Sequence, residues 1–177
     1  LLEISGVQSA PYGGRKGERT SPPHTTSYTV PGISGLSGLS SFKTDGTDSA
    51  QVTITGTNFG PVGATANPVS AVYQNSALTS TYASGEFTAS GCVVSVAHTE
   101  ITCSPVVGAG RGQQWKVTVG DQQSSASTST TSYIAPAITA LSGLTTFETN
   151  GSFSDLVTIT GTNFGPVDSH NEVVAVY

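Results

Sequence analysis

The sequence predicts an all-β protein, from its composition, from short alternating segments and from an internal repeat. Of its 177 residues, 25 are Ser, 26 are Thr, 21 are Gly and 9 are Pro. Only 10% of residues are charged and Met is absent, whereas helical bundles and coiled coils are rich in Ala, Leu, Glu and Lys. Thr, Val and Ile favour strands, and Gly and Pro favour the turns between them.

Charge and hydropathy exclude several functional classes. Six Lys and Arg residues against eleven Asp and Glu give a net charge of −5, whereas a nucleic-acid-binding protein needs a basic face. A membrane-spanning helix needs about 20 consecutive apolar residues, and the sequence has no such run. Disordered chains combine high charge with few β-branched residues. We therefore expect a folded β protein with no nucleic-acid partner and no membrane insertion in this segment.

Short apolar or alternating segments between turn residues give the expected strands. Val52-Thr-Ile-Thr alternates apolar and polar side chains, as a half-buried strand does. Gly56 and Gly60 bracket its exit, where we expect a backbone that glycine adopts most easily. Asp45-Gly46 predicts a turn. The other expected strands are 33–39, 69–73, 92–96, 100–103, 115–119 and a Ser/Thr-rich strand ending at Tyr133.

An internal repeat of about 105 residues decides the architecture. Residues 52–62 (VTITGTNFGPV) recur without change as residues 157–167. Residues 31–62 and 136–167 are identical at 21 of 32 positions. A unit of this length fits a β-sandwich.

The phase of the repeat divides the chain into one whole unit and two partial ones. We expect residues 31–135 to form a complete repeat. Residues 1–30 are expected to be the C-terminal strand and linker of a preceding repeat, and residues 136–177 the N-terminal part of a following one. Since a partial sandwich cannot bury its core, both flanking parts are expected to need further chain or a partner.

These residues resemble the IPT/TIG family, the immunoglobulin-like domains found in plexins, some receptors and some transcription factors. The resemblance covers nearly all of the chain and implies tandem immunoglobulin-like β-sandwiches. Its carrying features are the VTITGTNFG motif that occurs twice, the Pro-x-Ile openings at Pro31 and Pro136, the pair Cys92 and Cys103, and the closing Thr-Ser-Tyr133. Gly108-x-Gly110, Trp115 and residues 119–124 are also similar to units of very long tandem-repeat surface proteins of protists and algae.

Cys92 and Cys103 are the only cysteines and flank an expected hairpin that turns at Ala97-His98. As a disulfide they would close a short loop and stabilise the fold by about 3 kcal/mol in the chain-entropy model. That pairing implies an oxidising, extracellular setting. The alternative is two buried thiols in a cytosolic protein. A structural zinc site usually needs four ligands at tight spacing, so these cysteines do not indicate a metal.

Hydroxyl-rich segments near the unit junctions and one sequon are candidate glycosylation sites. Asn150-Gly-Ser is the only N-glycosylation sequon and falls on an expected turn. Residues 20–27 and 124–132 suit O-glycosylation, and Ser21-Pro-Pro is similar to the hydroxyproline-linked sugar sites of algal wall and flagellar glycoproteins. The alternative is an unmodified loop or edge strand. The candidates in the first tract are Thr20, Ser21, Pro22, Pro23, Thr25 and Thr26.

No constellation of residues predicts an enzyme, a metal site or a cofactor. His24, His98 and His170 fall on expected linkers and turns, where a solvated side chain is a simpler interpretation than a catalytic base. Residues 45–48 (DGTD) have too few ligands for a calcium loop, and the second copy of the repeat does not keep them. A plain turn explains them better.

The function that we expect is structural. The chain would be a segment of a large extracellular tandem-repeat glycoprotein that forms a rod, or a cell-surface or flagellar filament, by domain stacking and lateral contacts. Its partners would be neighbouring repeats of the same chain, other copies in a homo-oligomeric assembly, and glycans. The alternative is an adhesion or receptor ectodomain or a carbohydrate-binding module, which needs an exposed aromatic platform. The candidates for that platform are Tyr73, Tyr82, Phe87 and Trp115, although aromatic residues on strands are more often buried.

Overall fold

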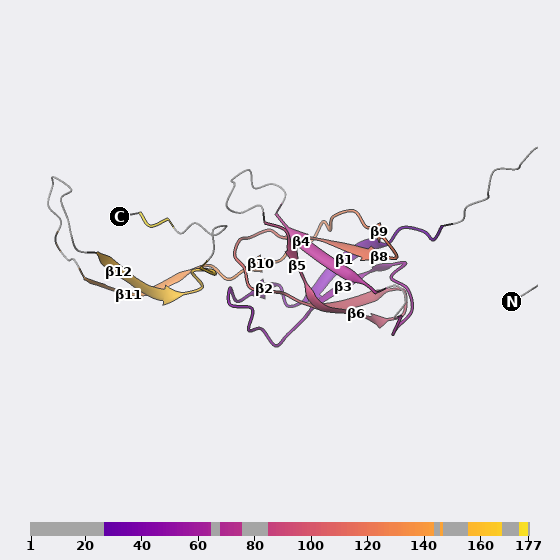
Figure 1. The fold of residues 1–177 in the computed structure, drawn as a ribbon, viewed down its shortest axis with the longest axis horizontal. Coiled ribbons are helices and arrows are strands. Elements are labelled where there is room, and N and C mark those ends of the chain that lie inside the picture. The colour runs from indigo at the N-terminus through magenta and orange to yellow at the C-terminus, as the bar shows by residue number, and fades with distance from the viewer. Residues whose placement is uncertain are drawn as a thin grey trace, which may run out of the picture.

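The computed structural model describes residues 27–64, 68–75, 85–143, 146, 156–167 and 174–176. Within these ranges the chain contains strands and no helix, and all but one of the strand pairings are antiparallel. The predicted all-β class is confirmed. Figure 1 shows a body formed by the strands of residues 32–133, from which a hairpin of residues 137–162 extends at one end.

One four-stranded antiparallel sheet contains the motif that occurs twice. Its strands, in spatial order, are β1 (Gly32–Gly38), β3 (Val52–Thr57), β7 (Glu100–Ser104) and β6 (Ser90–Val96). Val52 and Ile54 on β3 are fully buried, and the threonines between and after them are not, as the alternation predicts. β6 and β7 form the predicted hairpin, and His98 in its turn has a φ of 67°.

A second four-stranded antiparallel sheet lies against the first. Its spatial order is β5 (Phe87–Thr88), β4 (Ser70–Gln74), β8 (Gln114–Val119) and β9 (Gln122–Gln123). A short parallel pair joins β2 (Ser41–Phe42) to β10 (Ser132–Tyr133). The predicted Ser/Thr-rich strand toward Tyr133 is therefore wrong for most of its length, because residues 124–130 leave the regular ladder.

Both sheets contribute to one hydrophobic core. The first sheet contributes Val52, Ile54, Val94, Ile101 and Cys103, and the second contributes Ala71, Tyr73, Trp115 and Val117. Phe42, Phe59 and Tyr133 complete it from the connecting segments and from the β2–β10 pair. These inward residues alternate along each strand, so each sheet has one buried face.

A bulge in β1 explains the unusual spacing of its apolar residues. Ile33 and Leu36 are three positions apart, which would place them on opposite faces of a regular strand. The register shifts between Ile33 and Gly35, so that Ile33 lies opposite Gly56 and Leu36 opposite Ile54. One extra residue in the bulged strand restores the face, and both side chains pack against the core.

The exit from β3 corrects the role that we expected for Gly56. Positive φ angles occur at Asn58 (63°) and Gly60 (84°), but not at Gly56. A Cβ atom on Gly56 would collide with the carbonyl oxygen of Gly32 and with the ring of Phe59. Glycine is needed there because the neighbouring strand and the Phe59 ring approach closely, whereas Gly60 fits the expected conformational reason.

The second copy of the motif forms the same hairpin. β11 (Ala137–Gly143) pairs antiparallel with β12 (Val157–Thr162), from Ala137 opposite Thr162 to Gly143 opposite Val157. The pairing of β1 with β3 runs from Gly32 opposite Thr57 to Gly38 opposite Val52, which is the same register 105 residues earlier. The bulge recurs as well, between Ile138 and Ala140.

Candidate functional site

The predicted pair of cysteines forms a disulfide between neighbouring strands. Cys92 on β6 and Cys103 on β7 have Cα atoms 4.2 Å apart and an S–S distance of 2.06 Å. Cys103 is fully buried in the core, and Cys92 packs against it from the edge strand. The bond therefore ties the edge strand β6 to the interior of the sheet. Disulfides persist in oxidising compartments, which gives a weak indication of where this chain works.

The aromatic residues proposed as a glycan platform lie mostly in the core. Tyr73 and Trp115 are fully buried, and Phe87 is partly buried. Tyr73 stacks on Trp115 with ring centroids 4.4 Å apart and on Phe87 at 5.3 Å. Tyr82, the fourth candidate, lies outside the described residues. The three described rings form part of a structural cluster and do not form a flat exposed surface for a sugar ring.

Two tyrosine hydroxyls clamp the backbone of Val106, an arrangement that the sequence did not reveal. The amide of Val106 donates to Tyr73 Oη at 2.9 Å, and Tyr133 Oη donates to the Val106 carbonyl oxygen at 2.7 Å. The two hydroxyls are 2.8 Å apart. Since Tyr133 uses its only proton on Val106, Tyr73 donates to Tyr133. The closing Thr-Ser-Tyr133, which occurs twice in the sequence, was the available signal.

Burial raises the pKa of both hydroxyls above the usual value of 10.0. The main cause for Tyr73 is desolvation, partly offset by the hydrogen bond that it accepts from the Val106 amide. Desolvation is also the main cause for Tyr133. Both groups therefore stay protonated at neutral pH and serve as neutral hydrogen-bonding groups within the fold.

The hydroxyl-rich tract 124–132 is not uniformly available for glycans. Ser124 Oγ accepts from the amide of Val117 at 3.0 Å, and Ser127 Oγ accepts from that of Trp115 at 2.9 Å. These hydroxyls occupy positions along β8 where a neighbouring strand would place carbonyl groups. Thr131 Oγ1 accepts from Trp115 Nε1 at 2.9 Å, and all three residues are buried. As glycosylation sites, Ser124, Ser127 and Thr131 are therefore excluded in the folded chain.

The remaining candidate positions are mostly exposed or outside the described ranges. Ser125, Thr128, Ser129 and Thr130 are exposed, whereas Ser132 is partly buried and accepts from the Gly112 amide at 3.0 Å. Asn150 lies outside the described residues, as do Thr20, Ser21, Pro22, Pro23, Thr25 and Thr26, and their predictions remain predictions.

The turn at Asp45-Gly46 is formed as predicted, and it serves the fold. The Gly46 amide donates to the Lys43 carbonyl oxygen at 3.3 Å, and Gly46 has a φ of 68°. Asp45 accepts from the amide and hydroxyl of Thr47, at 3.0 and 2.8 Å. These two hydrogen bonds lower the pKa of the exposed Asp45 carboxyl. In the described part of the chain, no three His, Cys, Asp or Glu residues are grouped so that they could hold a metal ion.

His98, the one predicted histidine within the described ranges, acts through its backbone. Its amide donates to the Gly60 carbonyl oxygen at 2.7 Å, and its carbonyl oxygen accepts from the Phe59 amide at 3.1 Å. These two bonds fasten the β6–β7 turn to the exit of β3. His98 is exposed, which agrees with a solvated side chain. His24 and His170 lie outside the described residues.

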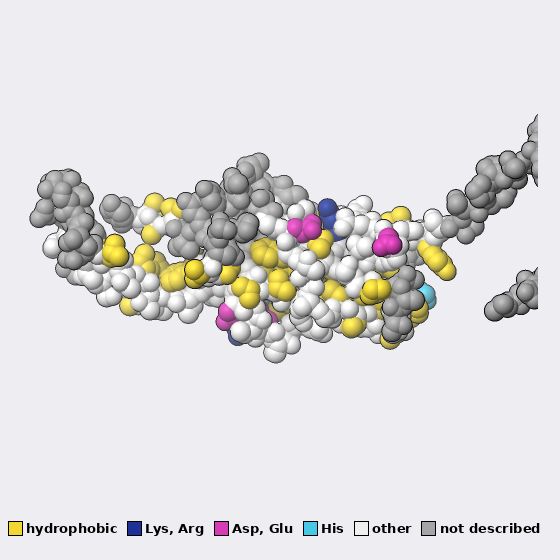
Figure 2. All heavy atoms as spheres, viewed as in Figure 1, with side chains coloured by type: hydrophobic (Ala, Val, Ile, Leu, Met, Phe, Trp, Pro, Cys, Tyr) yellow, Lys and Arg dark blue, Asp and Glu magenta, His cyan; other side chains and the backbone are white. Residues whose placement is uncertain are grey.

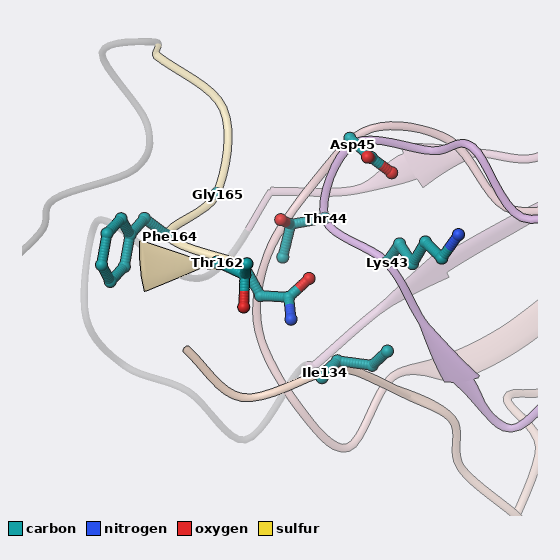
Figure 3. A pocket seen from close by; sticks show the side chains of 8 residues that line it. Lys43, Thr44, Asp45, Ile134, Thr162, Phe164 and Gly165 are labelled. Carbon is teal, nitrogen blue, oxygen red and sulfur yellow. The ribbon is translucent and has the colours of Figure 1, made fainter. Parts of the chain in front are cut away.

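The junction between the complete unit and the second hairpin contains a hollow of about 510 Å³. Figure 3 shows Lys43, Thr44 and Asp45 of the turn and Ile134 of the connecting segment opposite Thr162, Phe164 and Gly165, at the end of β12 and just after it. Only residues 134–136 connect β10 to β11. The first of them is held in place, because the Ile134 amide donates to the Phe42 carbonyl oxygen at 2.7 Å. The polypeptide therefore passes from β10 to β11 over a short, partly fixed path.

Asn58 fixes the segment that enters the complete unit. Its side-chain nitrogen Nδ2 donates to the carbonyl oxygen of Val30, the residue before Pro31, at 3.1 Å. Asn is one of the few non-glycine residues that adopt a positive φ readily. The motif Thr-Asn-Phe-Gly thus places one side chain on the linker and another, Phe59, in the core. Asn163, its counterpart, lines the hollow at the next junction.

The second hairpin exposes apolar side chains that its first copy covers. Leu141 is 66% and Ile138 62% exposed. Their counterparts Leu36 and Ile33 pack against the core. Figure 2 shows hydrophobic side chains gathered over this hairpin and few charged ones on the surface in that view. A surface of this kind is an interaction surface more often than a free one.

No helix among the described residues is long and apolar enough to cross a membrane. No protein-family model, no curated protein and no solved structure matches the chain.

Proposed function

We propose that this chain is a structural segment of a large extracellular tandem-repeat glycoprotein, which forms a rod or a cell-surface or flagellar filament. The observation that carries the proposal is the second hairpin. β11 pairs with β12 in the same register in which β1 pairs with β3, 105 residues earlier in the chain. The bulge in β11 also lies at the position that matches the bulge in β1. Proteins built of repeated units gain length with each unit, and each unit contacts chiefly its neighbours.

Several features support an immunoglobulin-like sandwich of the IPT/TIG type as the repeated unit. Two four-stranded antiparallel sheets enclose one core, and a disulfide joins two strands of the first sheet. Tyr133, near the end of the unit, bonds back to the backbone of Val106 and so ties the closing segment to the chain that follows β7. The register repeated in the second hairpin supports a tandem arrangement of these units.

Short connections and low surface charge support assembly. The three-residue connection between β10 and β11 leaves little freedom between successive units. Only 17 side chains of 177 carry formal charge, and a weakly charged surface repels other copies less than a charged one. Val93 and Val96 on the edge strand β6 are exposed. Two register shifts interrupt the β6 ladder, which favours side-chain contact between neighbours over continued strand pairing.

The disulfide supports an extracellular location, and the exposed hydroxyls support glycosylation. Cys92 and Cys103 leave no free thiol, as is usual for an exported chain. Ser125, Thr128, Ser129 and Thr130 offer exposed hydroxyls near the junction with the following unit. Glycans at these positions would lie beside the connection without entering the core.

Electron microscopy of the native material tests the structural role. We expect elongated particles or filaments with a regular spacing of units along the axis. Mass spectrometry of proteolytic peptides tests the proposed glycosylation. We expect sugar masses on the peptide that contains residues 125–130. Compact, separate globules in the micrographs would contradict the proposed role, and unmodified masses for all hydroxyl-rich peptides would contradict the glycoprotein.

The alternative, an adhesion or receptor ectodomain or a carbohydrate-binding module, has less support. Burial of Tyr73 and Trp115 removes two of the four candidate platform residues, and Phe87 is partly buried and stacks on Tyr73. The exposed Ile138, Leu141 and Val157 of the second hairpin are aliphatic, which fits protein better than sugar.

A further inference from the structure

We propose that the β11–β12 hairpin binds a segment with the chemistry of residues 70–135, supplied by the same polypeptide behind the hairpin. Residues 174–177 begin this segment, because Ala175-Val-Tyr177 matches Ala71-Val-Tyr73 of β4 in sequence. The bound segment would pair a β7-like strand with the outer edge of β12 and cover the apolar face with a β4–β8-like sheet. The inference deepens the proposed tandem array and rests on it, because it names what each hairpin of such an array requires.

The apolar face provides the first argument. Val52 on β3 is fully buried, whereas its counterpart Val157 on β12 is 39% exposed. The sequences of the two strands are identical, and so is their pairing with the preceding strand. The difference in burial therefore comes from what covers the strand, and not from the strand itself. In the complete unit that cover consists of Tyr73, Trp115 and Val117 on β4 and β8, with Ile101 on β7.

The strand edge provides the second argument. β3 uses one edge for β1 and the other for β7, whereas β12, within the described residues, pairs with β11 alone. The β3–β7 ladder places Val52 opposite Cys103, Ile54 opposite Ile101 and Thr55 opposite Glu100. Added strands bind such edges through main-chain hydrogen bonds and gain specificity from alternate side chains. The expected register on β12 is therefore Val157 opposite a cysteine, Ile159 opposite an isoleucine and Thr160 opposite a glutamate.

The order of elements along the chain favours a segment supplied in cis. In the complete unit β4 begins at Ser70, soon after β3 ends at Thr57, so a short connection is enough to bring the cover into place. Short connections have a small closure entropy and give a high effective concentration. A second copy of the chain fits less well, because its own β7, β4 and β8 already cover its β1–β3 hairpin.

An extended chain tests the inference directly. The sequence of residues 74–135 is appended after Tyr177, and amide hydrogen exchange is compared between the 177-residue chain and the extended chain. We expect exchange of the β12 amides to slow by at least about 100-fold, since amides in a folded core exchange through rare opening. The β3 amides, protected in both chains, serve as the internal reference.

Two variants of the extended chain separate specific cover from general crowding. Ile159→Lys places a charge on the face to be covered and should abolish the added protection. Thr160→Lys places the same charge on the solvent side, where the counterpart Thr55 is exposed and lies opposite Glu100. It should keep most of the protection, because opposite charges on paired strands attract. Equal loss in both variants would contradict the proposed register.

Other outcomes overturn the inference. If β3 remains protected in the extended chain and β12 does not, the hairpin does not bind this segment. If the 177-residue chain already protects β12 in a concentration-dependent way, the occupant is a second copy. Either result leaves the proposed structural role untouched. Electron microscopy tests that role separately, since elongated native particles would still support it if the docking proposal failed.

Discussion

The β1–β3 and β11–β12 hairpins differ in surroundings far more than in backbone. Positive φ angles recur at matched positions: 63° at Asn58 and 57° at Asn163, and 84° at Gly60 and 90° at Gly165. Gly161 meets the same obstacles as Gly56, a carbonyl oxygen of the preceding strand and a phenylalanine ring. Yet the apolar residues of the first hairpin lie in or against the core, and those of the second are largely exposed.

This difference separates what the local sequence fixes from what tertiary packing supplies. The backbone conformation just after the second strand, the bulge position and the strand register are the same in both hairpins, so they follow from local residues. Burial, and with it most of the stabilising free energy, depends on β4, β7 and β8. Identical substitutions in the two hairpins should therefore have unequal effects, and the size of the inequality measures the contribution of the cover.

The largest inequality is expected at the central isoleucine. Ile54→Ala should lower the free energy of unfolding by about 4 kcal/mol, because it removes a fully buried side chain and leaves a cavity. Ile159→Ala, the same change on the partly exposed β12, should cost about 1 kcal/mol or less. Urea unfolding followed by Trp115 fluorescence measures the first loss, because Trp115 lies in that core, and hydrogen exchange of the β12 amides measures the second. Equal losses would mean that the second hairpin is covered as well as the first.

The disulfide should give the next largest effect, confined to the complete unit. Replacing both Cys92 and Cys103 by Ala should cost about 3 kcal/mol, since the bond closes a short loop in the unfolded chain. Exchange of the β3 and β7 amides should accelerate, while that of the β11 and β12 amides should stay as it was. The opposite result, faster exchange in β12, would show that the two hairpins are energetically coupled.

The closing tyrosine gives a third matched pair. Tyr133→Phe should cost about 2 kcal/mol, because the part-buried carbonyl of Val106 and the buried hydroxyl of Tyr73 both lose a partner. Tyr28, its counterpart 105 residues earlier, is 91% exposed, and Tyr28→Phe should change stability by less than about 0.5 kcal/mol. Thermal or urea unfolding of the two variants provides the comparison. A matching cost at Tyr28 would contradict the exposed position.

The raised pKa of Tyr73 and of Tyr133 adds a pH dependence with a definite sign. An unfolded tyrosine ionises near pH 10, and the folded chain holds both protons more tightly. Their contribution to stability is therefore complete below about pH 10 and is lost as the pH rises further. Unfolding midpoints between pH 8 and pH 11.5 should fall in the wild-type chain and fall less in Tyr133→Phe. An equal slope in both chains would assign the dependence to other groups.

Residues with strictly local roles were predictable from the sequence. The alternation in β3, the turn at Asp45-Gly46 and the cysteine hairpin each depend on neighbours in the chain, and the structure confirms them. The repeated motif likewise predicted that residues 157–162 would form a strand like β3. The close approach at Gly56 was not predictable, because the Gly32 carbonyl that excludes a Cβ belongs to another strand.

The hydroxyl tract shows the same limit for the candidate site. From composition, residues 124–132 suit O-glycosylation along their whole length. In the fold, Ser124 and Ser127 supply acceptors to β8, and the residues between them face solvent. The spacing of three residues between the two serines is visible in the sequence. Their role as acceptors depends on β8, which lies beside them only in the folded chain. Aromatic burial was likewise foreseeable for Trp115, whereas the clamp on Val106 was not.

The smallest expected effect concerns Asn58, and it tests the linker before Pro31 more than the stability of the fold. Asn58→Gly keeps the positive φ available but removes the Nδ2 donor to the Val30 carbonyl oxygen. Because this bond is exposed, we expect a stability change of less than about 1 kcal/mol. The linker should respond more clearly: NMR order parameters of residues 29–31 should drop while those of β3 hold. Asn58→Asp, which cannot donate to a carbonyl when ionised, should mobilise the linker in the same way. If the linker stays rigid in both variants, the Asn58 hydrogen bond does not hold it.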